Sequence, residues 1–309
     1  MSSAADGSFS SKLLQYTNDR LERMAEQTRI AIASGDTEAV HALRVASRRL
    51  NEPLLVMRPW LRDRDVRHAR RLLRRTRAAF RRVRDLDVLQ ISLAKSLDLD
   101  TGTRAQIEGL LTKQRERALT RAIRRVERLS VANCVRAVRR LLRDYRDAFD
   151  DDQDALVDGL ATRFDRLAAG LLAHDPRSPQ SGDLHDARIR VKRCRYALEL
   201  GHRIEATDDA GLIQQLTDAQ DMLGQWNDHL VAAKWISRIA TRRAVLTRQT
   251  TWGRSLLEYA ARRIEAAERQ RLNVLERWPL LESSLRTCAW FGASLHESET
   301  TDRGVEASA

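Results

Sequence analysis

Hydrophobic side chains recur every three or four residues along most of the chain, the spacing that places them on one face of an α-helix. In the segment 63–83 the positions at this spacing are Ala69, Leu73, Thr76, Phe80 and Val83. Aromatic residues make up only 5% of the chain, whereas the helix formers Ala, Leu, Arg, Glu and Gln are abundant. Strands would require more β-branched and aromatic residues. The pattern therefore predicts an all-α protein.

Turn-forming and capping residues divide this pattern into a series of helices. The predicted segments are 11–33, 37 to beyond Pro53, 63–83, a helix after Asp85, 104–129, 132–149, one ending at 173, 184–204, 209–223, 227–248 and 255–277. We expect Asp36 to cap its helix and Pro53 to kink or end it. Further breaks are expected at 101–103, 174–183 and 278–279, and disordered tails at 1–10 and 296–309.

The second half of the sequence repeats landmarks of the first half. The segment 40–49 matches 184–193, which aligns His41 with His185, Arg44 with Arg188, Arg48 with Lys192 and Arg49 with Arg193. Asp85 aligns with Asp228, and the spacing from the histidine is 44 residues in one half and 43 in the other. A run of aspartates from 144 to 154 separates the halves. We therefore expect a duplicated helical bundle with repeats at 11–150 and 151–295.

The charge of the chain points to an anionic partner. The formal net charge is +12, and 50 of the 55 basic residues are arginine because lysine occurs at only five positions. Arginine presents a planar fork that pairs with phosphate oxygens, whereas lysine offers a point charge. A GC-rich genome would also favour arginine codons, but it does not account for the net charge. Phosphate recognition is the functional interpretation.

The basic residues form stripes at helical spacing. The three stripes are His41, Arg44 and Arg48; His185, Arg188, Lys192 and Arg195; and Arg70, Arg74, Arg77, Arg81 and Arg84. The last would extend over ~20 Å at ~1.5 Å per residue. Like charges four residues apart destabilise an isolated helix, so a long stripe suggests a bound anion. The alternative is a solvated basic face with distant acidic partners.

Four further residues have two interpretations each. A helix histidine is usually a packing residue, but His41 and His185 each begin a basic stripe, where a phosphate would raise the histidine pKa. The matched acids Asp85 and Asp228 either orient Arg or His side chains of a neighbouring helix or cap helices.

Three motifs together resemble a known family. They are V-H-x-L-R-V-x-x-R-R-L from residue 40, R-D-L-D-V-L from residue 84, and L-H-x-x-R-I-R-V-K-R-x-R-Y-x-L-E from residue 184, followed by L-G-x-x-N-D-H. In this order they resemble the CHAD family, the conserved histidine α-helical domains, over about residues 12–290. The resemblance implies two four-helix bundles about a pseudo-two-fold axis and a basic central cleft for inorganic polyphosphate. It also implies an association with polyphosphate granules.

The resemblance also suggests which residues face the ligand. Carried over by position, these are His41, Arg44, Arg48, Arg49, His185, Arg188, Lys192, Arg193, Arg195 and Tyr196. The stripe residues Arg74, Arg77, Arg81 and Arg84 complete the predicted polyphosphate site, with Asp85 and Asp228 as its orienting residues. The halves differ where Asn51 and Glu52 stand opposite Arg195 and Tyr196, and where Pro53 interrupts the first motif.

Several other function classes lack sequence support. The E-x-E-x-K signature of a fused CYTH domain, the P-loop, H-E-x-x-H and G-x-S-x-G patterns are absent. We therefore expect a binding protein rather than an enzyme, with no cofactor or metal. Three scattered cysteines and the lack of a signal peptide or membrane span favour the cytoplasm. Nucleic-acid binding, an enzyme of phosphate metabolism and a helical adaptor remain alternatives.

Overall fold

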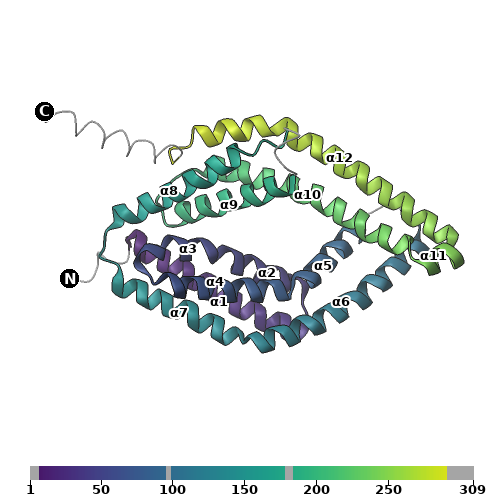
Figure 1. Cartoon of the computed structure of the whole chain (residues 1–309), viewed down its shortest axis with the longest axis horizontal. Helices are drawn as coiled ribbons and strands as arrows, with labels where there is room; N and C mark the ends of the chain where they lie inside the picture. Colours follow the sequence, from purple (N-terminus) through teal and green to yellow (C-terminus); the bar gives the residue numbers. More distant parts are fainter. Residues whose placement is uncertain (1–6, 95–98, 178–183, 291–309) are drawn as a thin grey trace.

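A computed structural model describes residues 7–94, 99–177 and 184–290, which fold into helices and short connections (Figure 1). The elements are α1 (Phe9–Ser34), α2 (Thr37–Arg49), α3 (Asn51–Val56), the 3₁₀ turn η2 (Arg58–Trp60), α4 (Asp63–Ala79), α5 (Arg81–Ala94), α6 (Thr101–Leu129), α7 (Val131–Ala148), α8 (Gln153–Leu172), α9 (Leu184–Arg203), α10 (Ala210–Ala240), α11 (Arg243–Arg248) and α12 (Thr250–Arg286). The predicted all-α class is confirmed.

The helices are arranged on two sides of the molecule (Figure 1). One side holds α8, α9 and the long pair α10 and α12, which pack along each other. The other holds α1, α2, α3, α4 and α7, while α5 and α6 extend toward α10 and α12. In the described part of the chain, no helix is both apolar and long enough to cross a bilayer.

Three clusters of buried side chains form the core. One joins α8 and α9 to the first part of α10 and the end of α12, around Phe164. A second joins α5 and α6 to the rest of α10 and the start of α12, around Phe80 and Tyr259. A third lies among α1, α2, α4 and α7, around Met24. The predicted boundary at 150–151 falls between α7 and α8, but the first and second clusters each combine residues from both sides of it.

Several helix ends match the sequence pattern. Asp36 caps α2 by accepting a hydrogen bond from the Ala39 amide at 2.6 Å. Gly35 ends α1 with φ of 66°, a left-handed conformation that favours glycine. The three cysteines are buried and form no disulfide with one another. Residues 9 and 10, expected in a tail, belong to α1, whereas residues 1–6, 178–183 and 291–309 lie outside the described ranges.

Other helix ends differ from the prediction. The motif helix breaks at Leu50, so Pro53 lies in the first turn of α3, where its missing N–H is not needed. The segment 63–83 breaks at Phe80, whose buried ring belongs to a different cluster from the core face of α4. The predicted break at 101–103 is the first turn of α6, because Asp100 caps that helix.

The C-terminal helices are longer than predicted. The segments predicted at 209–223 and 227–248 join in the helix α10, which continues through Gly224 and ends at Ala240, and the rest of the second segment forms the separate short helix α11. Similarly, α12 continues through Pro279. A proline inside a helix costs roughly 3 kcal/mol. Trp278 and Leu281 on either side are buried, and their packing offsets this cost.

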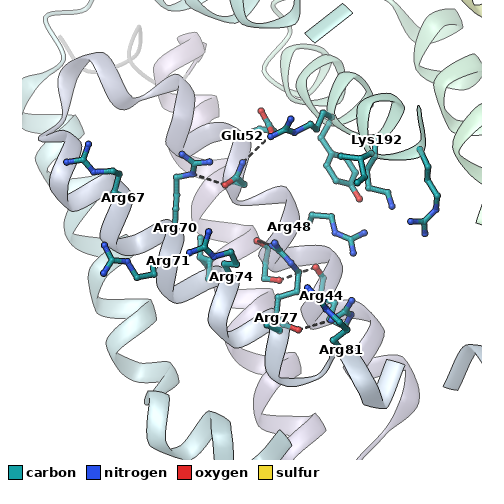
Figure 2. A pocket seen from close by; sticks show the side chains of 18 residues that line it. Arg44, Arg48, Glu52, Arg67, Arg70, Arg71, Arg74, Arg77, Arg81 and Lys192 are labelled. Atoms are coloured by element: carbon teal, nitrogen blue, oxygen red, sulfur yellow. Dashed lines mark hydrogen bonds between the residues drawn. The ribbon is translucent and has the colours of Figure 1, made fainter. Parts of the chain in front are cut away.

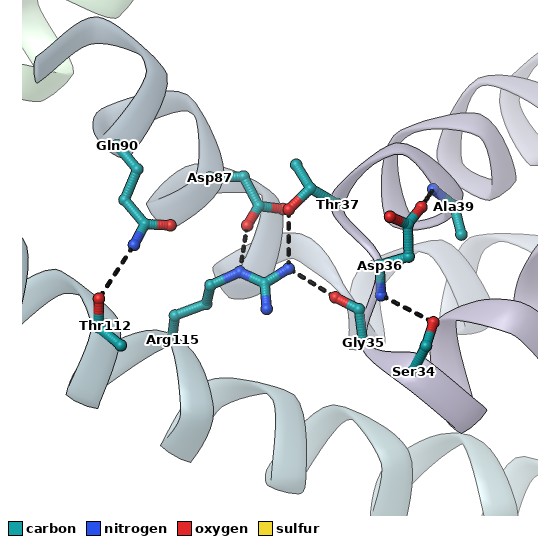
Figure 3. Close-up of polar contacts among 9 residues, drawn as sticks. All are labelled: Ser34, Gly35, Asp36, Thr37, Ala39, Asp87, Gln90, Thr112 and Arg115. Atoms are coloured by element: carbon teal, nitrogen blue, oxygen red, sulfur yellow. Dashed lines mark hydrogen bonds and ion pairs between the residues drawn. The ribbon is translucent and has the colours of Figure 1, made fainter. Parts of the chain in front are cut away.

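A buried ion pair holds the turn between α1 and α2 against α5 and α6 (Figure 3). Arg115 Nε donates to Asp87 Oδ1 at 2.5 Å, and the Asp87 side chain is completely buried. Arg115 Nη2 donates to the Gly35 carbonyl at 2.7 Å and to Thr37 Oγ1 at 3.1 Å. One guanidinium on α6 therefore binds both α5 and the turn between α1 and α2, and it fixes the start of α2.

Replacing Asp87 by Ala should lower the free energy of unfolding by about 3–5 kcal/mol, because the buried Arg115 charge loses its partner. Urea titration followed by circular dichroism measures this change. The control is Glu26→Ala, since Glu26 pairs with Arg29 on the exposed surface and should leave unfolding nearly unchanged. Equal effects of the two substitutions would contradict the assigned role of Asp87.

Candidate functional site

The packing of three helices directs their basic faces toward one space. The α2 helix buries Leu43 and Ala46, which leaves Arg44 and Arg48 on another face. In the same way α4 buries one face against the third core cluster and turns arginines away from it. The α9 helix buries Ala187, Val191 and Cys194, and it presents Arg188 and Lys192.

These faces line a cavity of about 670 Å³, here called the arginine cavity (Figure 2). Ten arginines and one lysine line it: Arg44, Arg48, Arg67, Arg70, Arg71, Arg74, Arg77, Arg81, Arg188, Lys192 and Arg193. The remaining lining residues are Ser47, Asn51, Glu52, Leu73, Ala78, Ile189 and Tyr196. Glu52 is the acidic residue among them, and it forms an ion pair with Arg163.

Arg44 and Arg77 hold α2 and α4 together by reciprocal hydrogen bonds (Figure 2). Arg44 Nη1 donates to the Arg77 carbonyl at 2.7 Å, and Arg77 Nη1 donates to the Ser47 carbonyl at 3.4 Å. Both carbonyls lie in the last turns of their helices, where backbone acceptors lack partners and the helix dipole favours cations. The two arginines therefore cap helix ends while facing the cavity.

The cavity cations are partly removed from water and crowd one another. Burial, followed by the charge of nearby arginines, lowers the pKa of Arg44 and of Arg77 to about 10. The same causes lower the pKa of Lys192 to about 7, and Arg48 and Arg188 are the charges that contribute most after burial. Burial also lowers the pKa of Arg188 and Arg70. An anion in the cavity would relieve both the desolvation and the mutual repulsion.

The two matched aspartates lie near the matched arginines. Burial raises the pKa of Asp85, and the charges of Arg44 and other nearby arginines oppose that rise. Burial likewise raises the pKa of Asp228, against a hydrogen bond from Asn227 and the charge of Arg188. Each aspartate in turn favours the charged form of the arginine of its own half. Neither aspartate lines the cavity, and their predicted orienting role remains a prediction.

The structure places nine of the predicted ligand residues at the cavity and five outside its lining. Those at the cavity are Arg44, Arg48, Arg74, Arg77, Arg81, Arg188, Lys192, Arg193 and Tyr196. Those outside its lining are His41, Arg49, Arg84, His185 and Arg195. Because α4 ends at Phe80, Arg81 and Arg84 belong to α5, and the predicted continuous stripe is split between two helices.

The motif histidines differ from each other in environment. His41 is half-buried, and burial together with the charge of Arg84 lowers its pKa, so without an anion it is mostly neutral at pH 7. His185 is exposed at the start of α9. A phosphate near His41 would raise this lowered pKa and favour the charged imidazolium.

Sequence reasoning missed several residues of the site. Arg67 and Arg71 lie three residues before Arg70 and Arg74 on α4, and the three-residue helical spacing applied to the predicted stripe would have found them. Arg163, the partner of Glu52, comes from α8 and carries no sequence signal. Only the tertiary packing brings it beside α3.

Comparisons with known proteins agree with this architecture. The sequence profile of the CHAD domain matches residues 15–237. The crystal structure of the CHAD domain from the plant Ricinus communis is similar with a TM-score of 0.60 and 19% identity, covering 93% of this chain and 95% of that one. PptA from Streptomyces chartreusis has a TM-score of 0.58 and 19% identity, covering 86% and 99% respectively. No curated protein sequence matches the chain significantly.

The depressed pKa of Lys192 should make stability depend on pH. Between about pH 7 and 10.5 the unfolded chain keeps the Lys192 proton that the folded protein has lost, so folding stability rises with pH in this window. Urea unfolding of the wild type and Lys192→Met at several pH values isolates this contribution. The wild type should gain stability relative to the variant as pH rises, and a constant difference would contradict the burial of this amine.

Proposed function

The chain belongs to the CHAD family, and we propose that it binds inorganic polyphosphate in the arginine cavity. The family is associated with polyphosphate binding in general. The observation that carries the proposal for this chain is the convergence of ten arginines and one lysine on one cavity. The one lining carboxylate, Glu52, is ion-paired with Arg163, so it does not neutralise the other cations. A flexible polyanion would exchange its condensed counterions for these side chains.

The lining favours an anion without bases over a nucleic acid. Single strands are bound by stacking bases on aromatic side chains. Tyr196 is the aromatic lining residue, and it is buried beneath Arg49 and Arg195, whose guanidinium carbons lie 5.8 and 5.3 Å from its ring centroid. A thin chain of phosphates suits the cavity best.

We also propose that binding occurs without hydrolysis, in the cytoplasm and on polyphosphate granules. Metal-dependent phosphate hydrolysis uses clustered carboxylates or histidines. Over residues 7–94, 99–177 and 184–290, no group of three or more His, Cys, Asp or Glu is arranged to hold a metal ion. The role would be attachment to polyphosphate rather than its turnover.

Removing cavity cations should weaken polyphosphate binding in proportion to lost contacts. One double variant, Arg44→Ala with Arg48→Ala, removes two cations from the α2 side of the cavity. The other, Arg188→Ala with Lys192→Ala, removes two cations from the α9 side. A charged hydrogen bond contributes about 1.5–3 kcal/mol. If both removed cations contact phosphate, the slope of log K against log salt should become shallower by about 1.4, at roughly 0.7 per contact on a single strand.

The matched control is Arg242→Ala with Arg243→Ala. These exposed arginines lie at the junction of α10 and α11, away from α9 in Figure 1. The control removes the same net charge and should change affinity and salt slope much less. If it lost as much affinity as the two cavity variants, binding would depend on overall charge and the cavity would not be the site.

Polyphosphate should bind more tightly than DNA or RNA at equal phosphate concentration and physiological salt, because the cavity offers charge but no open stacking surface. Fluorescence anisotropy with labelled chains, each competed by the other two, gives the comparison. Equal or tighter binding of a nucleic acid would favour the alternative function of a nucleic-acid-binding helical protein.

Incubation of the protein with polyphosphate and Mg²⁺ or Mn²⁺ should release no orthophosphate above a buffer control. A colorimetric phosphate assay over several hours measures this directly. More orthophosphate than protein, on a molar basis, would demonstrate turnover and favour the alternative function of a phosphate-metabolism enzyme.

A further inference from the structure

Two ion pairs cross between the halves of the chain beside the arginine cavity. In the first, Glu52 on α3 accepts a hydrogen bond from Arg163 Nε on α8 at 2.7 Å, with a second from Arg163 Nη2. In the second, Glu199 on α9 lies 3.1 Å from Arg49 Nη2, at the end of α2. The Glu52 side chain is 6% exposed and that of Glu199 is 19% exposed. Both pairs are therefore largely shielded from water.

The two pairs are reciprocal. The first half supplies the carboxylate of one pair and the arginine of the other, and the second half supplies their partners. The backbone of α3 packs against both α8 and α9. Together the two pairs connect the segment α2–α3 to the segment α8–α9, the two segments that carry Arg44, Arg48, Arg188 and Lys192.

The second pair is part of a larger cluster. Glu199 Oε1 also lies 3.4 Å from Arg195 Nε, one turn earlier on α9. The guanidinium carbons of Arg49 and Arg195 both lie over the Tyr196 ring. The charges of Arg49 and Glu199 reach Tyr16 on α1 as well. Arg49 and Arg195 are thus directed to Glu199 and Tyr196, which explains why they do not line the cavity.

A carboxylate beside a polyanion site carries an electrostatic cost, because it repels the ligand. Burying a charge is also unfavourable unless it is paired. Glu52 lines the cavity and Glu199 lies one turn from Tyr196, so both carboxylates oppose binding through their charge alone. Their arrangement is consistent with a different contribution, which is to hold the two cationic walls at a defined separation.

We propose that Glu52 and Glu199 are positioning residues that form a latch between the halves and so set the separation of the cavity walls. The proposal rests on the proposed function and deepens it, because it assigns Arg49 and Arg195 to the latch rather than to phosphate. The ligand contacts then come from residues such as Arg48 and Arg188, which face the cavity.

Neutralising the latch carboxylates tests the proposal, since charge and position predict opposite results. Glu52→Gln and Glu199→Gln each make the protein more positive, so simple electrostatics predicts tighter polyphosphate binding. The latch predicts affinity on the order of tenfold weaker. It also predicts an unchanged salt slope, because no phosphate contact is removed. The control Glu38→Gln neutralises an exposed carboxylate on α2 and should leave affinity unchanged or raised. Binding by either latch variant as tight as wild type would overturn the proposal.

A second substitution tests whether the lost polyphosphate affinity can be restored. Adding Arg163→Gln to Glu52→Gln removes the unpaired buried cation and allows two amides to hydrogen-bond across the same gap. The latch predicts that affinity returns toward wild type, although a cation has been lost. Further weakening would show that Arg163 acts by its charge, which also contradicts the latch.

A measurement without ligand separates the latch from the proposed function. Spin labels at exposed positions on α4 and α10, introduced by Arg75→Cys and Asp221→Cys, report the separation of the two sides by pulsed electron resonance. The Glu52→Gln, Glu199→Gln double variant should broaden or lengthen the distance distribution relative to wild type. An unchanged distribution would overturn the latch even if polyphosphate binds. Failure of wild type to bind polyphosphate, with a broadened distribution in the variant, would overturn only the proposed function.

Discussion

Desolvation and mutual repulsion of the cations in the arginine cavity oppose the packing of the helices around it. Ten arginines and one lysine converge on a space of about 670 Å³. Burial and, after it, the neighbouring positive charges lower the pKa of Arg44, Arg77 and Lys192, so gathering these cations is unfavourable without an anion. The surrounding helices must therefore be held by interactions strong enough to keep the basic faces together.

Two kinds of interaction meet this requirement. The apolar faces of α2, α4 and α9 are buried in the core clusters, and this burial supplies most of the stabilisation. Hydrogen bonds and ion pairs then fix the positions of the helix ends. Arg44 and Arg77 cap the ends of each other's helices, and Arg115 binds Asp87 and the turn at Gly35. Several arginines thus stabilise the helix packing, while others face the cavity and are available to bind a ligand.

Arginine can serve both the stability of the fold and the binding of an anion. The planar guanidinium can bind carbonyls and carboxylates inside the protein with good geometry, and it can bind phosphate oxygens in the same way. Arg48 and Arg49 are neighbours in sequence, but successive helix positions point in different directions. Arg48 therefore faces the cavity, whereas Arg49 meets Glu199 and Tyr196.

Helical periodicity and capping are local properties, so the amino-acid pattern was enough to predict the all-α class, most helix positions and the basic residues around the matched histidine motifs. It did not determine that α4 stops at Phe80 or that α10 continues through Gly224, since the core packing of those residues decides between break and continuation. Nor did it reveal the partnership of Glu52 with Arg163. Whether a given arginine lines the cavity, caps a helix end or forms an ion pair depends on neighbours that are distant in the sequence. Tertiary packing therefore decides it.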